Sequence, residues 1–133
     1  MASIPESFHD LFEKRTIAHF ATMTPEGFPH VTPVWIDYDL ETDRVLVNTA
    51  RGRRKERNVT RNPKVGVSMV DPDDPYRYCS VTGTVTALTE DGAEAHIDAL
   101  AGRYMDLDEY PNYDSDRGLR VVVEIEPDAV VTT

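Results

Sequence analysis

The chain has 133 residues, of which 40% are hydrophobic and 29% charged, and its formal net charge at pH 7 is −10. This length and composition predict one soluble globular domain over residues 1–133, and no apolar run approaches the roughly 20 residues that span a bilayer. The acidic balance argues against general binding to nucleic acid or to anionic membranes, because both would repel the chain at long range.

The first fifty residues combine one helical pattern with several strand patterns. Residues 5–12 predict a short helix, because Phe8, Leu11 and Phe12 recur at helical spacing. The turn at residues 24–27, with Pro25 where its fixed φ fits, joins two strands into a hairpin. The strands predicted here cover residues 16–23, 29–38 and 44–49.

In the rest of the chain the sequence pattern changes twice from strand alternation to helical spacing. Over residues 52–62 the strand alternation gives way to helical spacing, and Asn62-Pro63 ends this helix because the residue before a proline leaves the α region. A further helix is predicted from Glu90 to about Met105, capped by Thr89, and Gly83 marks a bulge. Residues 71–75 and 106–118 are expected to be loops. The strands cover residues 64–70, 76–88 and 119–126, with a resumption after Pro127 over residues 129–132 left open.

These elements predict a mainly β fold. About six strands, mostly connected by hairpins, with two or three helices indicate an antiparallel barrel with helical additions. A doubly wound parallel sheet would need strict alternation of strands and helices, which this order does not show.

The sequence contains no pattern that identifies a metal site or a nucleophile. The four histidines show no metal-ligand spacing, and neither a hydrolase serine motif nor a glycine-rich phosphate loop occurs. Cys79 is the only cysteine, so no internal disulfide can form. Because a signal-peptide pattern is also missing, we expect a cytoplasmic protein. We name no catalytic residue and expect no metal.

The basic stretch over residues 50–64 stands out in this acidic chain. It holds seven basic residues against one acid, a balance of +6, while the rest of the chain carries −16. It follows a strand directly, so the backbone N–H groups of its first helical turn can bind an anion, with Thr49, Arg54 and Lys55 beside them. A basic helix face neutralised by an acidic surface stays open as the alternative. A nucleic-acid helix is disfavoured by the surrounding charge.

Three stretches, in this order and spacing, resemble the pyridoxamine 5′-phosphate oxidase-like, FMN-binding split-barrel superfamily. They are TIAHFATMTPEGFPHVTPVWIDYD (16–39), VLVNTARGRRKERNVTRNPKVGVSMVDP (45–72) and PYRYCSVTGTVTALTEDGAEAHIDALAGRYM (75–105). The closer similarity is to the flavin/deazaflavin oxidoreductase branch, whose members use coenzyme F420. The family's ring-contacting arginine is replaced by Thr32, which argues against oxidation of pyridoxamine phosphate.

The resemblance implies a homodimer of split barrels with a cofactor at each interface. It implies a flavoprotein-like oxidoreductase that binds coenzyme F420, or alternatively FMN, and transfers a hydride to a small electron-poor organic substrate. A flavin- or deazaflavin-binding protein without turnover is the further alternative, and no nucleic acid or membrane partner is expected. The second strand would lie along the cofactor ring, and Tyr78 would reach the partner's cofactor. The implied cofactor-binding residues are Val31, Thr32, Pro33, Val34, Asn48, Thr49, Arg51, Arg54, Lys55, Asn58 and Tyr78.

Overall fold

Strands dominate the structure, a computed structural model that describes residues 2–111 and 119–133. Within these residues seven strands form one antiparallel sheet in the order β2-β1-β5-β6-β7-β4-β3. The predicted mainly antiparallel split barrel is thereby confirmed. The elements are η1 (Glu6–Phe12), β1 (Ile17–Met23), β2 (Pro29–Trp35), β3 (Asp37–Asp39), β4 (Arg44–Ala50), α1 (Arg54–Arg61), β5 (Lys64–Asp71), β6 (Asp74–Thr89), α2 (Ala93–Met105) and β7 (Arg120–Thr132).

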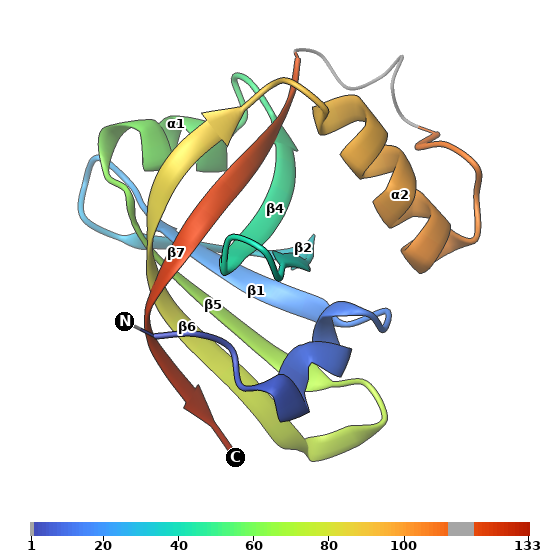
Figure 1. Cartoon of the computed structure of the whole chain (residues 1–133). Coiled ribbons are helices and arrows are strands. Elements are labelled where there is room, and N and C mark those ends of the chain that lie inside the picture. The colour runs from blue at the N-terminus through green and yellow to red at the C-terminus, as the bar shows by residue number, and fades with distance from the viewer. Residues whose placement is uncertain (1, 112–118) are drawn as a thin grey trace.

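The two edges of this sheet are joined by a single residue, Ile36. β2 is one edge strand and β3 the other, and they are consecutive in the chain. The sheet therefore has to curl until its edges meet, which produces the open barrel of Figure 1. The backbone N–H of Ile36 donates to the Tyr104 hydroxyl (3.1 Å), and its carbonyl accepts from Arg103 (2.7 Å). The backbone of Ile36 thus bonds to side chains of α2 and not to a neighbouring strand. The single strand predicted over residues 29–38 is therefore divided at Ile36 into β2 and β3.

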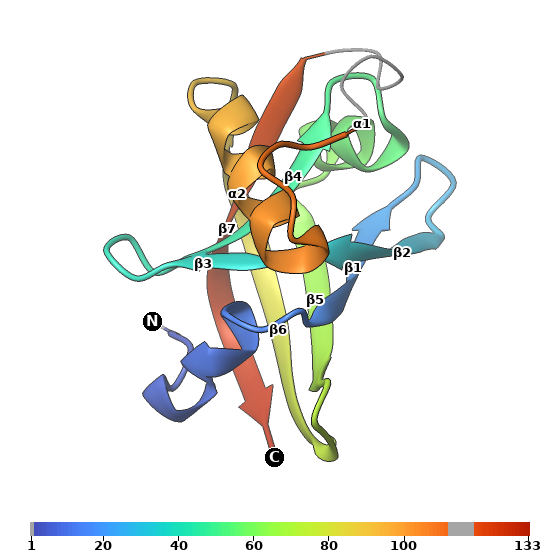
Figure 2. The same ribbon diagram turned by 90° about the vertical axis from the view of Figure 1, so that its right-hand side faces the viewer.

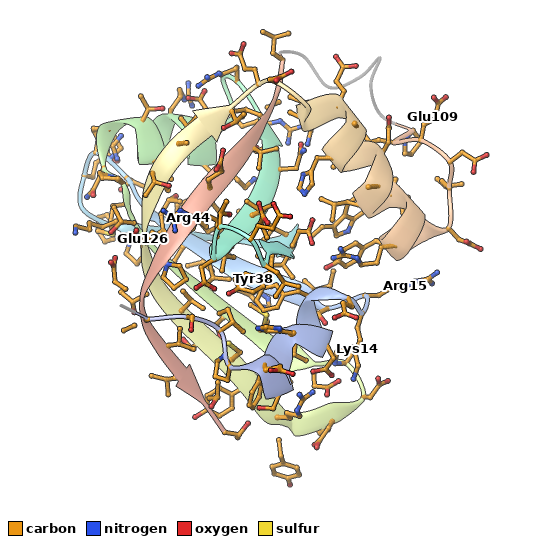
Figure 3. All side chains as sticks on the ribbon, in the orientation of Figure 1. Lys14, Arg15, Tyr38, Arg44, Glu109 and Glu126 are labelled. Carbon is orange, nitrogen blue, oxygen red and sulfur yellow. The ribbon has the colours of Figure 1, made fainter. Side chains whose placement is uncertain are left out.

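The inner face of the curled sheet holds the core. Alternate residues of β1, β4, β5 and β7 point inward and are buried, among them Phe20, Val47, Val67 and Val123. η1 covers one end of the barrel, while α1 and α2 flank the other (Figures 1 and 2). Tyr38 of β3 packs on Phe12 of η1 with ring centroids 5.2 Å apart, and Figure 3 shows it next to η1, in the middle of the molecule. On the surface, Arg44 of β4 pairs with Glu126 of β7 at 3.3 Å.

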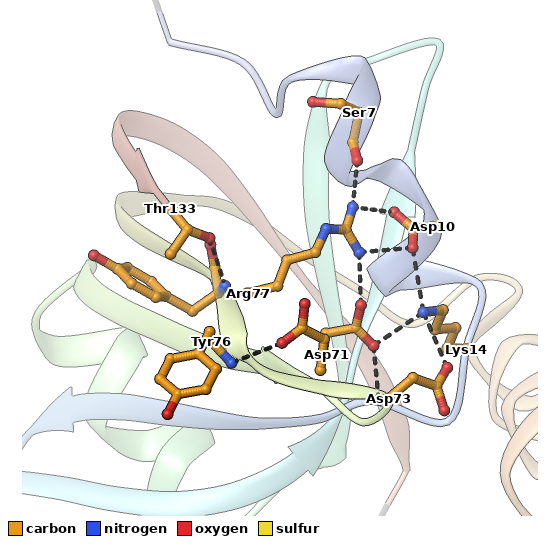
Figure 4. A network of polar contacts seen from close by, with 10 residues as sticks. Ser7, Asp10, Lys14, Asp71, Asp73, Tyr76, Arg77 and Thr133 are labelled. Carbon is orange, nitrogen blue, oxygen red and sulfur yellow. Dashed lines mark hydrogen bonds and ion pairs between the residues drawn. The ribbon is translucent and has the colours of Figure 1, made fainter.

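A polar network fastens η1 to the hairpin of β5 and β6 (Figure 4). Arg77 on β6 contacts both Asp71 and Asp10 at 2.7 Å, and Lys14 contacts Asp71 at 2.9 Å. The Asp73 backbone N–H, and then Lys14 and Arg77, lower the pKa of the buried Asp71 carboxyl to about 2. Asp71 is therefore ionised at neutral pH and serves as the anchor between the two elements.

Two local predictions in the second half of the chain were wrong. Residues 71–75 are not a loop, because Asp71 pairs with Asp74 and only two residues form the turn between β5 and β6. Thr89 does not cap α2: it ends β6 and donates to the Glu124 carboxylate, while α2 begins after Gly92, whose φ of 78° places it in a turn. The pairing of β6 with β7 therefore includes Thr89 in the strand, although the local sequence favours a helix cap at this position.

The last strand continues where a break at Pro127 was considered. β7 runs from Arg120 to Thr132, and its register with β6 shifts between Thr82 and Gly83, as the predicted bulge at Gly83 requires. The residue skipped at this shift is Asp128 on β7. A proline lacks the N–H that a regular ladder needs, and a bulge accommodates it.

The helices of the described residues are short. None of them combines the length and the apolarity that crossing a membrane would require.

Candidate functional site

A cavity of about 360 Å³, within the size range of ligand sites, opens between β2, the end of β4, α1 and α2. We refer to it as the site cavity. Its apolar lining consists of Ile17, Pro33, Val34, Trp35, Ile97 and Leu100. Its polar lining consists of Asn48, Thr49, Arg53, Lys55, Tyr110 and Arg120. An apolar wall beside a cationic end suits a ligand that has a flat ring system and an anionic group.

The turn between β4 and α1 brings cations to this cavity. Gly52 takes a φ of +90°, which favours glycine, and its N–H donates to the Glu56 carboxylate at 2.8 Å. Burial would raise the pKa of Glu56, but the Gly52 N–H, Thr60 and Arg51 outweigh it and hold that pKa below its usual range. Glu56, the single acid of the basic stretch, therefore stabilises the turn between β4 and α1. Arg51 pairs with Glu56 at 3.6 Å and with Glu90 at 3.0 Å, away from the cavity lining.

Five of the predicted cofactor-binding residues line the site cavity. They are Pro33 and Val34 from β2, Asn48 and Thr49 from β4, and Lys55 from α1. The structure therefore brings the end of the third predicted strand, the following helix and the second predicted strand together, in the arrangement that the resemblance implies.

Arg54 and Asn58 lie elsewhere around α1. A second, smaller hollow of about 280 Å³, which we call the arginine hollow, is lined by Pro25, Glu26, Arg54, Arg57, Asn58 and Arg61. Asn58 is buried and donates to the Thr22 hydroxyl at 3.0 Å, so its amide links α1 to β1. Arg57 and Arg61 share this hollow with Arg54.

Val31 and Tyr78 lie on the outer face of the sheet. Val31 is 54% exposed and Tyr78 38% exposed, and neither lines the site cavity. Since successive side chains of a strand point to opposite faces, Val31 points outward while Thr32 points inward with Phe20, its partner on β1.

Two polar atoms on the inner face of β2 have no hydrogen-bond partner among the described residues. They are Thr32 Oγ1 and His30 Nδ1, both buried. Burial, and then the charges of Arg54 and Lys55, lower the pKa of His30, so it is neutral at pH 7. Buried polar groups nearly always find a partner. A ligand lying along β2 would supply one, so these atoms fit a cofactor site there.

The sequence did not reveal the aromatic side of the site cavity. The Trp35 ring stacks on Tyr104 with centroids 5.0 Å apart and meets Tyr110 edge-on at 6.1 Å. The Arg120 guanidinium lies 5.1 Å from the centre of the Tyr110 ring. These residues come from β2, α2, the segment after α2 and β7, and no sequence spacing links them. The one available signal was that Trp35 is the only tryptophan.

The chain is similar to known proteins in sequence and in fold. A family model described as pyridoxamine 5′-phosphate oxidase matches residues 4–133. The solved structure of an F420 reductase is 34% identical with a TM-score of 0.82, over 96% of this chain and 98% of that chain. A conserved hypothetical protein from Mycobacterium tuberculosis is 22% identical (TM-score 0.75; 99% and 85% covered). The heme storage protein HutZ from Vibrio cholerae is 16% identical (TM-score 0.68; 98% and 94% covered). The last two similarities show the fold alone.

Proposed function

Because the chain belongs to the pyridoxamine 5′-phosphate oxidase family, we propose that it is an oxidoreductase that binds a deazaflavin, coenzyme F420, in the site cavity. The lining of the cavity carries this proposal. Apolar side chains from β1, β2 and α2 form one wall, and Thr49, Arg53 and Lys55 gather at the end of β4 and the start of α1. This lining offers a planar ring an apolar surface and a phosphate a cationic one.

The chain's own residues hold and orient the coenzyme in this proposal. Lys55 and Thr49 bind its phosphate, with Asn48 behind them, while Pro33, Val34 and Thr32 lie along the ring. When bound, the coenzyme supplies hydride transfer to a small electron-poor organic molecule. The protein then needs to position the ring and exclude water, which agrees with a sequence that has no nucleophile or acid–base pattern.

The preference for the deazaflavin over FMN rests on similarity. The F420 reductase structure shares 34% identity with nearly the whole of this chain. An FMN-dependent oxidoreductase is the alternative, because the same phosphate-binding residues suit either coenzyme.

We further propose that the protein is a homodimer. Large apolar side chains from five strands are exposed on the outer face of the sheet: Val31, Val70, Tyr78, Val131 and Ile17, of which Ile17 also lines the site cavity. Large apolar side chains exposed on one face of a sheet favour an interaction surface there. A partner seated there would approach Val31 and Tyr78, which a single chain leaves outside the site cavity.

Titration with both coenzymes tests the proposed function. Trp35 is the only tryptophan and lines the site cavity, so its fluorescence reports binding without any turnover. We expect coenzyme F420 to quench it at a lower concentration than FMN does. Binding of FMN alone would contradict the preference, and binding of neither would contradict the function.

Oxidation of the reduced coenzyme separates an enzyme from a binding protein. The protein loaded with reduced F420 is mixed with enones, quinones and tetrapyrroles as acceptors. Oxidation faster than without protein supports the oxidoreductase, whereas background rates with every acceptor favour a binder.

A further inference from the structure

A chain of hydrogen bonds leads from β3 through α2 and β4 to the site cavity. His96 on α2 contacts Asp37 on β3 through Nε2 at 3.0 Å and Asn48 on β4 through Nδ1 at 3.0 Å. The Asn48 side-chain oxygen accepts from Arg120 Nε on β7 at 2.9 Å. Asn48 and Arg120 line the site cavity, whereas His96 and Asp37 lie behind it.

The direction of every bond in this chain follows from its partners. Burial would raise the pKa of Asp37, but hydrogen bonds from His96 and Arg103 outweigh it and keep that pKa low. Asp37 is therefore a carboxylate that can only accept, so His96 Nε2 carries a hydrogen. The Asn48 nitrogen donates to the Ala93 carbonyl at 2.9 Å and also to His96, so His96 Nδ1 is the acceptor.

The Asn48 amide is consequently held in one orientation. Both of its N–H bonds are used, by Ala93 and His96, and its oxygen is turned toward Arg120. Arg120 is buried, at 7% exposure, and lies against the Tyr110 ring. With its Nε bonded to Asn48, the plane of its guanidinium is set by that amide. The terminal nitrogens of a guanidinium held in this way suit an anionic oxygen.

We propose that Arg120 binds an anionic oxygen of the ligand in the site cavity and that His96 is its positioning residue, acting through the Asn48 amide. The identity of the ligand rests on the proposed function, whereas the coupling of His96 to Arg120 does not.

Protonation of His96 breaks this arrangement. When Nδ1 of His96 also carries a hydrogen, two donors face each other, His96 Nδ1–H and the Asn48 N–H. If the Asn48 amide turned over so that its oxygen accepted from His96, its N–H would point at Arg120, which is also a donor. The charged groups that contact His96 directly or through one hydrogen-bonded residue are Asp37 from β3, Arg103 from α2 and Arg120 from β7. Protonation of His96 therefore weakens anion binding.

Two substitutions of His96 separate its two hydrogen bonds. In His96→Asn the side-chain oxygen takes the place of Nδ1 and still accepts from Asn48, but it does not titrate. In His96→Gln the amide reaches the place of Nε2, near Asp37, and no acceptor is left for Asn48. Affinities for FMN and F420 are measured by Trp35 fluorescence at about pH 7.5 and about pH 5.5.

We expect His96→Gln to bind about five- to tenfold more weakly than His96→Asn at the higher pH, which corresponds to one lost hydrogen bond. Acidification should weaken binding to the wild-type protein more than binding to His96→Asn. Any ionisation of the ligand itself affects both proteins equally, so the difference belongs to His96. Equal affinities of the two variants, or an equal pH response of wild type and His96→Asn, would overturn the proposal.

Nitrogen NMR of the wild-type protein gives a test that needs neither a variant nor a ligand. We expect His96 at neutral pH to carry its hydrogen on Nε2 and to have a bare Nδ1, and the Asn48 side-chain N–H signals to shift when His96 is protonated. The opposite tautomer, or Asn48 signals indifferent to pH, would refute the coupling. If neither coenzyme binds the wild-type protein, the proposed function fails, while this measurement still decides the coupling.

Discussion

Arg54 and Lys55 are adjacent in the sequence, yet they line different cavities. Successive residues of a helix differ by about 100° in direction. Lys55 therefore faces the site cavity, while Arg54 faces the arginine hollow with Arg57 and Arg61, its neighbours on the same side of α1. At the scale of single residues, the basic stretch is two groups of cations and not one.

Replacing Lys55 tests which group holds the coenzyme. We expect Lys55→Ala to weaken coenzyme binding by about 1.5–3 kcal/mol, the range for losing a charge-assisted hydrogen bond. Arg57→Ala removes the same charge from the same helix, but from the arginine hollow, and should change the affinity little. Titrations of both variants by Trp35 fluorescence show which of the two groups binds the coenzyme. Equal losses in the two variants would mean that general charge, not a contact, attracts the coenzyme.

Between elements, the paired strands β6 and β7 lie close together at Gly83. A Cβ added to Gly83 would lie 2.6 Å from Ile125 Cγ2 and 2.8 Å from the Glu126 carbonyl oxygen. The side chain of Ile125 could turn away, but the backbone oxygen of Glu126 belongs to the strand itself. Glycine at this position lets the two strands approach at the bulge.

Gly83→Ala should therefore destabilise the protein by about 1–3 kcal/mol in urea unfolding, as overpacking does. Gly102→Ala is the matched control, since its new Cβ would meet only the Leu107 oxygen at an ordinary 3.6 Å. In the interior of α2, alanine should leave the stability unchanged or raise it by up to about 1 kcal/mol. A Gly83→Ala protein as stable as wild type would show that β7 can move.

The attachment of η1 to the β5–β6 hairpin should make stability depend on acid. The pKa of Asp71 is lowered to about 2, so its ion pairs stabilise the protein fully above its unfolded value, about 3.9, and are lost as the pH falls through about 2. Asp71→Asn removes this dependence. The difference in unfolding free energy between wild type and variant should narrow between about pH 4 and about pH 2.

Urea unfolding at several pH values measures this difference, and Glu41→Gln, an exposed acid in the β3–β4 turn, is the control. A difference between wild type and Asp71→Asn that stays constant with pH would assign the role of Asp71 to hydrogen bonding alone.

For the whole molecule, the exposed outer face of the sheet predicts how two chains associate. Val70 on β5 and Val131 on β7 are 46% and 58% exposed on this face. We expect sedimentation to show a dimer for the wild-type protein and a monomer for Val70→Lys/Val131→Lys, since buried lysines without partners oppose association. Leu40→Lys, at an equally exposed apolar position in the β3–β4 turn, should remain dimeric. A dimer that persists in the double variant would place the interface elsewhere.

Local sequence patterns are enough to predict the order and type of most elements. The hairpin at residues 24–27, the helix that ends before Pro63 and the irregularity at Gly83 all depend on neighbouring residues, and local rules describe them well. Local patterns also locate the cationic end of the site, because Thr49 and Lys55 follow a strand end in the sequence. The number of basic residues in a stretch and the position where a helix starts both depend on residues that are close in sequence, so a local pattern predicts them.

How the strands meet and which side chains share the cavity depends on contacts between distant parts of the chain. The break at Ile36 between β2 and β3 exists because Tyr104 and Arg103, far along the chain, bind the Ile36 backbone. Likewise Trp35 and Arg120 reach the site cavity, and His96 reaches Asn48, only through the register of a closed sheet and the position of α2. Such contacts join residues that are distant in sequence, so no local pattern specifies them.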